Sequence, residues 1–403
     1  MLVLFTIVLI DLIGFGLVIP LLPFYAERFG ASPDVVTMVL ATYSLAQLFA
    51  APVWGRLSDR HGRRPILLVS LAGSALSYLW LGFATHLWML FAARALAGLC
   101  AGNIAAAQAY VADVTAPENR AKGMGMIGAA FGLGFIIGPA VGGALAGHDP
   151  NAPAVSIPAF LGAAMSALAF VGTVFVLKES LPAERRGKPS SRRSRVAAIL
   201  SAIGRPDLRL LLGLYFIIIF AFAGMETTFA LWAARQFGWG PAQVGYVFAY
   251  VGVLSAAMQG GLIGRLTTRF GERRVLVAGL AAICIGLAAL PVSTVLAALL
   301  LSTACLAVGM GMTQPSINAL ISRQAGAHEQ GEVMGVSQSL GSLARILGPA
   351  FAGICFANIG RNSPYVAGAV LMAFAVALAV HLVRGTAAVA AGYDMAPKTR
   401  HAP

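Results

Sequence analysis

The sequence predicts an all-α integral membrane protein whose twelve transmembrane helices form two pseudo-symmetric six-helix halves. The first observation is composition: 59% of the 403 residues are hydrophobic, 11% are charged, and the mean hydropathy is +0.82. A helix needs about 20 mostly apolar residues to cross about 30 Å of hydrocarbon, and the chain contains many runs that approach this length. The composition therefore places the chain in the integral membrane class.

The second observation is a basic segment that occurs twice. Residues 55–65 are rich in glycine and arginine, and their outline returns 209 residues later at 264–274. Each copy lies between two long apolar runs, so each is expected to be a tight loop joining two membrane helices. The pattern of the first copy rests on Gly55, Asp59, Arg60, Gly62, Arg63 and Arg64.

The repeat also includes the apolar runs themselves. Gly14 recurs as Gly224 and Gly138 as Gly348, each pair 210 residues apart. Six helices therefore repeat as six, with one long polar stretch between them. The expected divisions are an N-terminal half at 1–177, a linker at 178–207, a C-terminal half at 208–383 and a tail at 384–403.

Each expected helix is an apolar run bounded by polar, glycine or proline residues. In the first half they lie at 4–24, 36–57, 66–84, 87–112, 122–146 and 156–177. In the second half they lie at 208–234, 242–264, 273–291, 294–321, 332–358 and 364–383.

The basic residues indicate which side of the membrane each loop faces. Alternate loops, together with the tail, hold 23 of the 28 Lys and Arg residues, whereas the opposite loops hold only Arg28, Arg235 and Arg361. Lys and Arg are enriched in cytoplasmic loops, so both termini are expected in the cytoplasm. Arg63 and Arg64 are expected to anchor the first basic loop at the lipid headgroups.

Other classes of protein are disfavoured by the sequence. A net charge of +13 suggests nucleic acid in a soluble protein, but here the charge is segregated into alternate loops, as topology signals are. The four cysteines lie inside apolar runs without the spacing of metal or disulfide sites. No catalytic constellation or nucleotide site is present, so we expect no enzyme activity and no cofactor.

Several segments carry a resemblance to a known family. Residues 55–65 resemble the cytoplasmic loop signature of the major facilitator superfamily, and residues 94–98 (RALAG) resemble a second signature. Residues 11–16 are similar to the start of bacterial tetracycline/proton antiporters. Residues 134–143 resemble a third signature, that of the proton-driven exporters. The residues that carry this resemblance are Gly134, Gly138, Pro139, Gly142 and Gly143.

The resemblance implies a major facilitator fold that works by alternating access, with a substrate site near the midplane between the halves. It further implies a bacterial inner-membrane protein that exports tetracycline-like or other amphipathic drugs in exchange for protons, with the proton gradient as its energy source; a metabolite or sugar exporter or uptake facilitator of the same fold is the alternative. The lipid bilayer is its expected surrounding, and a monomer is its expected state.

Ionisable residues inside the apolar runs are the candidates for proton coupling. Such a residue costs about 2.5–3.5 kcal/mol on insertion scales, so it normally faces a cavity or a partner. The candidates are Asp11, Arg94, Glu226 and Arg345. We hypothesise that Asp11 or Glu226 alternates between a proton and the substrate, because an apolar cavity favours the neutral carboxyl and a cation favours the carboxylate. A permanent ion pair with Arg94 or Arg345 is the alternative.

Polar and aromatic residues within the runs are candidates for substrate binding. Hydrogen bonding between helices accounts equally well for each amide. The candidates are Gln47, Asn103, Gln108, Phe222, Tyr246, Gln259, Gln314 and Asn318.

The sequence departs from the best-known tetracycline exporters in ways that affect the expected substrate. Those proteins carry an acidic residue in the third helix, where this chain has Ser77, and a histidine in the eighth, where it has Ser255. Chemistry based on a metal–tetracycline complex is therefore in doubt, and another lipophilic drug or a metabolite is an open alternative. Uptake of a metabolite and a non-transporting membrane sensor are the further alternatives.

Asp59 is the one residue of the first basic loop that topology does not require. The second copy has Thr268 at the equivalent position, so a carboxylate is not needed to hold the loop. By resemblance, Asp59 is expected to latch the two halves together on the cytoplasmic side in the outward-facing state. A plain solvated charge is the alternative.

Overall fold

The computed structural model describes residues 2–116, 119–182, 201, 204–325 and 329–394. Within these residues every regular element is helical, and twelve helices are long and apolar enough to cross a membrane. The predicted fold class is therefore confirmed.

The N-terminal half contains six spans, two of which are interrupted. The first span bends at Pro20 and Pro23, and the fourth is broken at 100–102. Its elements are α1 (Leu2–Val18), η1 (Ile19–Leu21), α2 (Leu22–Arg28), α3 (Pro33–His61), α4 (Arg63–Gly82), α5 (Leu87–Leu99), α6 (Asn103–Val114), α7 (Arg120–Ala146) and α8 (Ser156–Phe175).

The C-terminal half also contains six spans. Its elements are α10 (Pro206–Phe237), α11 (Pro241–Ala257), the π-helical turn η4 (Met258–Leu262), α12 (Ile263–Phe270), α13 (Glu272–Ala289), η5 (Leu290–Val292), α14 (Leu296–Gln324), α15 (Gln330–Asn358) and α16 (Ser363–Asp394). Helix α16 continues to Asp394, beyond the end at 383 that hydropathy predicted. Most of the expected linker (183–200 and 202–203) and the last residues (395–403) lie outside the described residues.

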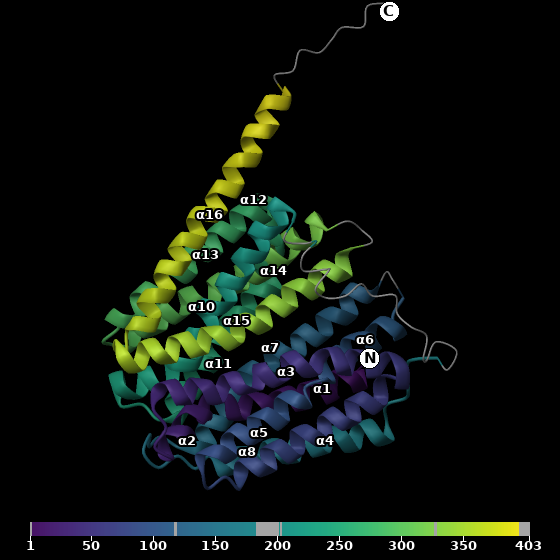
Figure 1. Cartoon of the computed structure of the whole chain (residues 1–403), viewed down its shortest axis with the longest axis vertical. Coiled ribbons are helices and arrows are strands. Elements are labelled where there is room, and N and C mark those ends of the chain that lie inside the picture. Colours follow the sequence, from purple (N-terminus) through teal and green to yellow (C-terminus); the bar gives the residue numbers. More distant parts are fainter. Residues whose placement is uncertain (1, 117–118, 183–200, 202–203, 326–328, 395–403) are drawn as a thin grey trace, which may run out of the picture.

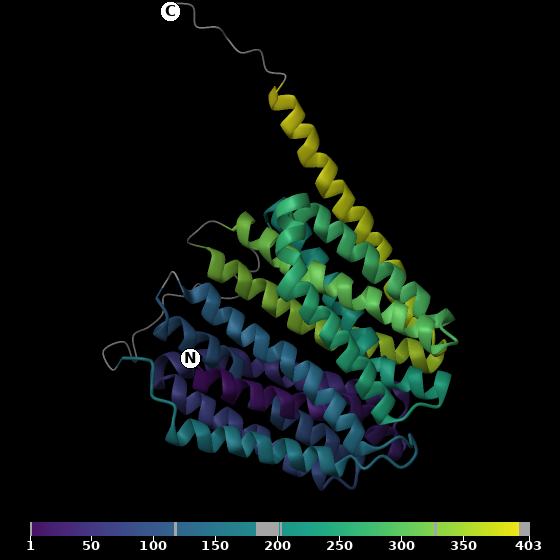
Figure 2. The same ribbon diagram turned by 180° about the vertical axis from the view of Figure 1, so that it is seen from behind.

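The two halves form two separate helical bundles (Figure 1). The N-terminal half, purple to blue, packs below the C-terminal half, green to yellow, and the end of α16 projects away from both. The same two bundles are seen from behind in Figure 2. The bundles correspond to the repeat, because each contains six consecutive spans.

Glycines with a left-handed backbone make the tight turns of the two basic loops. Gly62 (φ 107°) joins α3 to α4, and Gly271 (φ 77°) joins α12 to α13. Residues with a Cβ rarely adopt this conformation, so the repeated glycine has a physical reason. We call the end of the molecule that holds these two turns the basic-loop end, and the other end, which holds residues 29–32, 147–155 and 238–240, the opposite end.

One face of α7 packs directly on the backbone of α1. A Cβ added at Gly134 would lie 2.7 Å from Cβ of Leu12, and one added at Gly138 would lie 2.6 Å from Cα of Gly16. Gly142 lies against the carbonyl group of Leu17. Small residues let membrane helices approach this closely, and the dispersion contacts thus gained hold them together.

The next face of α7 contacts the other half of the protein. A Cβ at Gly143 would lie 2.6 Å from the carbonyl oxygen of Pro241 and 3.2 Å from Cα of Gly245, both in α11. The backbone N–H of Ala242 also donates to the carbonyl oxygen of Gly147 (3.0 Å). The sequence motif at 134–143 therefore joins α7 to α1 and, at the opposite end, to α11.

Further contacts join the halves at the opposite end. Glu27 of α2 pairs with Arg235 of α10 at 3.3 Å. Gly353 of α15 packs against Asp34 and Thr37 of α3, so closely that a Cβ added at Gly353 would lie 2.9 Å from Cα of Asp34. The halves are therefore held together on both sides at this end.

The packing of α7 gives a first testable expectation. Gly142→Leu would drive a side chain into the Leu17 carbonyl, and overpacking typically costs about 1–3 kcal/mol, more where only backbone can yield. We expect a lower thermal midpoint and a reduced yield of monodisperse protein in detergent. Gly213→Leu is the matched control, because Gly213 is exposed with no atom within 4 Å of its Cβ position. Equal stability of the two variants would contradict the role assigned to this contact.

Candidate functional site

A large cavity lies between α7 of the N-terminal half and α10, α11, η4 and α14 of the C-terminal half. Its volume is about 1050 Å³. It extends toward the basic-loop end, because Gly125, Gly128 and Gly260 line it there, whereas α7 and α11 are in contact at the opposite end. Its walls are largely apolar and include the rings of Phe131, Phe135, Phe222, Phe229 and Phe248.

Glu226 is the only carboxylate among the described residues that line this cavity. Helix α10 is fixed on α15 just before it, where a Cβ at Gly224 would lie 3.1 Å from the carbonyl oxygen of Gly348. Within the described part of the chain, Glu226 has no hydrogen bond and no ion pair closer than 4 Å. Arg345 attracts the Glu226 carboxylate, but from farther away than an ion pair. The carboxylate can therefore accept another partner.

Two amides complete the polar lining of the cavity. Gln259 comes from the π-helical turn η4 and Gln314 from α14, and neither has a partner among the residues described. The hydroxyls of Ser255 and Thr303 also lie there, but they donate to the backbone carbonyls of Ala307 (3.3 Å) and Leu299 (2.8 Å). The groups left for a ligand are therefore one carboxyl and two amides.

Asp11 lies in a different environment, inside the N-terminal half. Its side chain accepts hydrogen bonds from Nδ2 of Asn103 and from Oγ of Ser166 (3.2 Å). The space beside it, about 10 Å³, is too small for a drug. The structure therefore separates the two carboxylates, with Glu226 on the cavity wall and Asp11 sealed between α1, α6 and α8.

Arg94 is buried beside Tyr43 and not beside a carboxylate. Its guanidinium carbon lies 4.6 Å from the centre of the Tyr43 ring, and its Nε has no hydrogen-bond partner. Among the described residues, neither Arg94 nor Arg345 forms an ion pair within 4 Å. The alternative of a permanent ion pair with Asp11 or Glu226 is therefore not what this structure contains.

A line of aromatic rings connects Arg94 with the cavity wall. Tyr43 lies 5.5 Å from Phe15, and Phe15 lies 6.2 Å from Phe135, measured between ring centroids. Phe135 is part of the cavity lining. The rings of Tyr43 and Phe15 thus lie between Arg94 and the lining ring of Phe135.

The remaining predicted binding residues divide between the cavity and other places. Phe222, Gln259 and Gln314 line the cavity, and Asn103 instead bonds to Asp11. The others lie outside the cavity lining: Gln47 is half-buried, Gln108 and Tyr246 are exposed, and Asn318 has a buried Oδ1 without a partner.

The first basic loop forms a network at the basic-loop end. Arg63 pairs with Asp59 through Nη1 (2.6 Å) and with Asp113 of α6 through Nε (3.0 Å). It also donates to Oγ of Ser58 (3.0 Å). The expectation that Arg63 anchors at lipid headgroups is therefore wrong, because the guanidinium is turned inward onto two carboxylates.

Glu179 caps the start of α4. It accepts hydrogen bonds from the backbone N–H groups of Arg63 (2.9 Å) and Arg64 (3.1 Å), and from those of Ser180 and Leu181 (both 3.0 Å). Burial alone would raise the pKa of this carboxyl, but the four N–H donors outweigh it and hold the pKa below its ordinary value. The sequence did not reveal this role, because Glu179 is far from the loop in the chain.

Arg64 is also turned inward, to the carbonyl of Val174 (2.5 Å).

The second basic loop carries an ion pair of reversed polarity. Glu272 stands at the repeat position of Arg63, and Arg323 at that of Asp113, and the two side chains pair at 2.5 Å. Each loop is therefore tied to the end of a neighbouring helix, α6 or α14.

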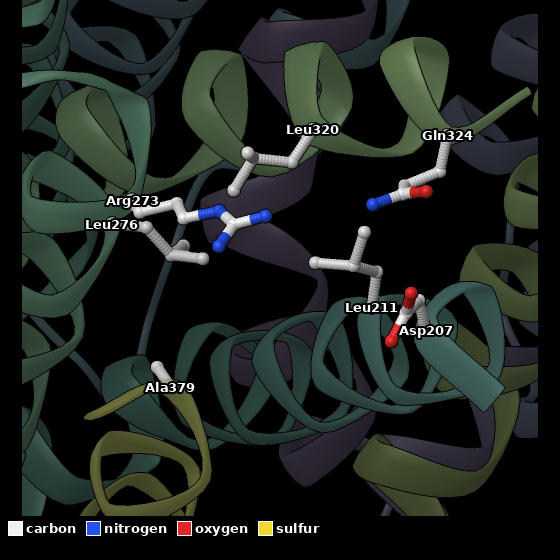
Figure 3. A pocket seen from close by; sticks show the side chains of 7 residues that line it. All are labelled: Asp207, Leu211, Arg273, Leu276, Leu320, Gln324 and Ala379. Carbon is white, nitrogen blue, oxygen red and sulfur yellow. The ribbon is translucent and has the colours of Figure 1, made fainter. Parts of the chain in front are cut away.

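A second, much smaller pocket lies near this loop (Figure 3). Its volume is about 50 Å³, and the Arg273 side chain reaches into it between Leu211, Leu276 and Leu320, with Asp207 and Gln324 at its rim. It is too small for a drug-sized molecule, which leaves the cavity between the halves as the candidate site. No group of three metal-binding side chains occurs among the residues that the structure describes.

The cap on α4 provides a second expectation. Glu179→Gln removes the charge that the four N–H groups stabilise, and a helix cap is typically worth about 1 kcal/mol. Because the folded-state pKa is lowered, this stabilisation is present above the ordinary carboxyl pKa and is lost as the pH falls through the folded-state value. Thermal unfolding in detergent should show a lower midpoint for the variant at neutral pH, and the gap should narrow in acid. A gap that is absent at neutral pH or that widens in acid would contradict the cap; Lys178→Gln, next in the chain, is the control.

Comparison with known proteins places this geometry in a family. The model of the Major Facilitator Superfamily matches residues 4–262 and 212–400. The tetracycline resistance protein of class C from Escherichia coli is 34% identical over 346 residues, which cover 85% of this chain and 86% of that protein. Multidrug resistance protein 2 from Bacillus subtilis (strain 168) is 31% identical, with 89% of each chain covered.

A solved structure gives the same result. The crystal structure of the human organic anion transporter MFSD10 (TETRAN) superimposes with a TM-score of 0.71 at 26% identity, covering 94% of this chain and 98% of that one. The two six-helix bundles, the cavity between them and these similarities together show that the chain belongs to the Major Facilitator Superfamily of membrane transporters.

Proposed function

We propose that this protein is a proton-coupled exporter of amphipathic drugs, working by alternating access in the bacterial inner membrane. The observation that carries the proposal is the cavity between the halves, where one carboxylate without a partner, Glu226, lies among aromatic walls. Relatives named for tetracycline and multidrug resistance support the same function. No group in the cavity's described lining suggests a reaction other than binding.

The charge distribution supports the orientation of the protein. The basic-loop end carries the arginines of both repeated loops, and by the positive-inside rule it faces the cytoplasm. Both termini then lie in the cytoplasm, and the cavity of this state opens toward the cytoplasm. A drug dissolved in the inner leaflet or the cytoplasm would enter from this side.

The lining of the cavity suits an amphipathic substrate. Ligand pockets commonly enclose about 300–1000 Å³ and combine apolar walls with a few polar groups. Here the five phenylalanines supply the apolar walls, and Gln259 and Gln314 supply donors and acceptors. The carboxylate of Glu226 favours substrates that carry a positive charge.

The two carboxylates suit two different parts of the exchange. Glu226 faces the cavity and has no fixed partner, so a proton and a cationic substrate can compete for it. Asp11 is held by Asn103 and Ser166 in a space without room for a drug, so it suits a proton alone. We therefore assign substrate-linked exchange to Glu226 and a second proton site to Asp11.

We assign each of the two arginines that lie within the spans, Arg94 and Arg345, to one of the two carboxylates. Arg345 attracts the Glu226 carboxylate over a longer distance than an ion pair, so it leaves the carboxylate available to another partner. Arg94 stands on the Tyr43 ring, and Tyr43 is within the electrostatic reach of both Arg94 and Asp11. Arg94 therefore suits a role beside Asp11 in proton movement within the N-terminal half.

The motif residues suit the movement between states. Pro139 and Gly143 of α7 lie on α11, where they would serve as the pivot between the halves. Asp59 is bonded to Arg63 within its own half in this cytoplasm-open state. Its proposed part as a latch belongs to the outward-facing state.

The positions that serve metal–tetracycline complexes in the resembled exporters hold hydroxyl groups here. Ser77 donates to the carbonyl of Ala93 (3.0 Å) and Ser255 to that of Ala307 (3.3 Å), so both are tied to backbone. The cavity thus offers a metal complex no carboxylate besides Glu226 in its described lining. An organic cation is the better match, and tetracycline itself is one member of the test panel.

Transport measurements test the proposal. The gene expressed in an efflux-deficient bacterium should raise the tolerated concentration of lipophilic cations, and a proton uncoupler should abolish the effect. In everted vesicles, Glu226→Gln should lower the export rate of a cationic drug about tenfold or more, because a buried carboxylate–cation contact is worth more than about 1.4 kcal/mol. Asp11→Asn should lower the stimulation by the proton gradient without abolishing it, because the exchange at Glu226 remains.

Asp207→Asn is the matched control, since it removes an exposed carboxylate from the cytoplasmic start of the same helix α10. Proton-driven export that survives Asp11→Asn and Glu226→Gln together would refute the scheme. Resistance that persists without a proton gradient would refute the coupling, and a response only to metabolites would favour the alternative substrate class.

A further inference from the structure

Helices α7 and α11 pack antiparallel in a regular register. Gly143 lies against Gly245, and seven residues further along both helices Gly252 lies against Ile136, with 2.8 Å from its Cβ position to Cγ1. Four residues beyond that, the Cβ position of Gly132 is 3.9 Å from Cβ of Ala256. This is the last point at which the two helices touch before the cavity separates them.

The same pairing of residues continues past the last contact, along the part of the two helices that lines the cavity. One more step of four residues leads to Gly128 on α7 and Gly260 on the facing helix, both of which line the cavity. Neither glycine has any atom within 4 Å of its Cβ position, whereas the glycines of the contacting part are packed against backbone. The two helices therefore diverge at a point where the residues on their facing sides are still glycines.

The π-helical turn η4 changes the register at this point. The N–H of Ile263 bonds to the carbonyl of Met258, five residues back, so the turn holds one residue more than an α-helical turn. The face that follows is shifted by one residue. The next residue to meet Gly125 is then Gly264, whereas an uninterrupted α-helix would place Ile263 there.

The packing of α12 confirms this shift. Met258, Ile263 and Leu266 pack with Val275 and Met312 in one apolar cluster, at spacings of five and three residues. An uninterrupted α-helix would bring Arg265, seven residues after Met258, to this face instead. The turn therefore brings the partly buried Ile263 into this cluster and leaves Gly264 exposed, with nothing within 4 Å of its Cβ position.

We propose that Gly125 and Gly128 of α7 form a contact face with Gly260 and Gly264 when the cytoplasmic side of the cavity closes, and that the π-turn sets the register of this contact. The face is continuous with the existing α7–α11 interface, so its occupant is the other half of the same chain. The inference rests on the alternating access of the proposed function.

The internal repeat supports the proposal independently. Gly335 of α15 stands at the repeat position of Gly125, and Gly55 of α3 at that of Gly264. These two glycines also have no atom within 4 Å of their Cβ positions, although α3 and α15 touch at the opposite end. The same unoccupied pair thus occurs twice, at the α7–α12 position and at its repeat on α15 and α3.

Disulfide formation tests the register. In a protein whose four cysteines are replaced (Cys100→Ala, Cys284→Ala, Cys305→Ala and Cys355→Ala), Gly125→Cys with Gly264→Cys should cross-link on mild oxidation in vesicles. A disulfide needs Cα atoms within about 7 Å, so Gly125→Cys with Ile263→Cys should cross-link roughly fivefold less. A prior disulfide between Asp34→Cys and Gly353→Cys, which holds the opposite end closed, should prevent the first cross-link. Equal or absent cross-linking of the 264 and 263 pairs would overturn the register.

A bulky residue at the gate tests the closure by another route. Gly264→Leu, outside the cavity lining, should insert normally and bind drug from the cytoplasmic side, yet export it at least about tenfold more slowly, because one side chain would hold the helices apart. Gly213→Leu should export at the rate of the unmodified protein. Export by Gly264→Leu at the unmodified rate would overturn the proposal. Cross-linking is measured without drug, so a cross-link in a protein that exports no drug would refute the proposed function and leave the register standing.

Discussion

Backbone-to-backbone packing of α7 is the constraint on which the rest of the structure depends. One face of this helix lies on α1 and the next on α11, and in both contacts glycines remove the side chains that would keep the helices apart. The halves are therefore joined firmly at one end, with the Glu27–Arg235 pair and the α3–α15 contact beside them. Because this contact ends at Gly132, the helices separate toward the basic-loop end, and the cavity is the result.

The same geometry gives the two buried carboxylates different chemistry. Glu226 lies on the wall that the separation of the halves exposes, so its environment changes whenever the halves move. Asp11 lies inside one half, and its partners Asn103 and Ser166 belong to that same half, so a rigid movement of one half against the other leaves them in place. A group whose surroundings alternate can exchange one partner for another, whereas a group with fixed surroundings can only gain or lose a proton. This difference is why we assign the substrate to Glu226.

The fold followed from the sequence because its causes are local and repeated: apolar runs of spanning length, a glycine at each tight turn, and basic residues in alternate loops. The site followed only in part. Phe222, Glu226, Gln259 and Gln314 do line the cavity, but the partners of Asp11 and Arg63 come from distant helices, which no local pattern reveals. The π-turn was also hidden, although the spacing of Met258, Ile263 and Leu266 fits it better than an α-helix.

Proton release on drug binding tests the central claim most directly. Purified protein in weakly buffered detergent solution should release a proton when a lipophilic cation such as tetraphenylphosphonium binds, because the cation and the proton compete for the Glu226 carboxyl. Glu226→Gln should bind the cation more weakly and release none, while Asp11→Asn should still release it. Proton release that persists in Glu226→Gln and disappears in Asp11→Asn would show that the substrate exchanges at the sealed site, and would contradict the assignment of the substrate to Glu226.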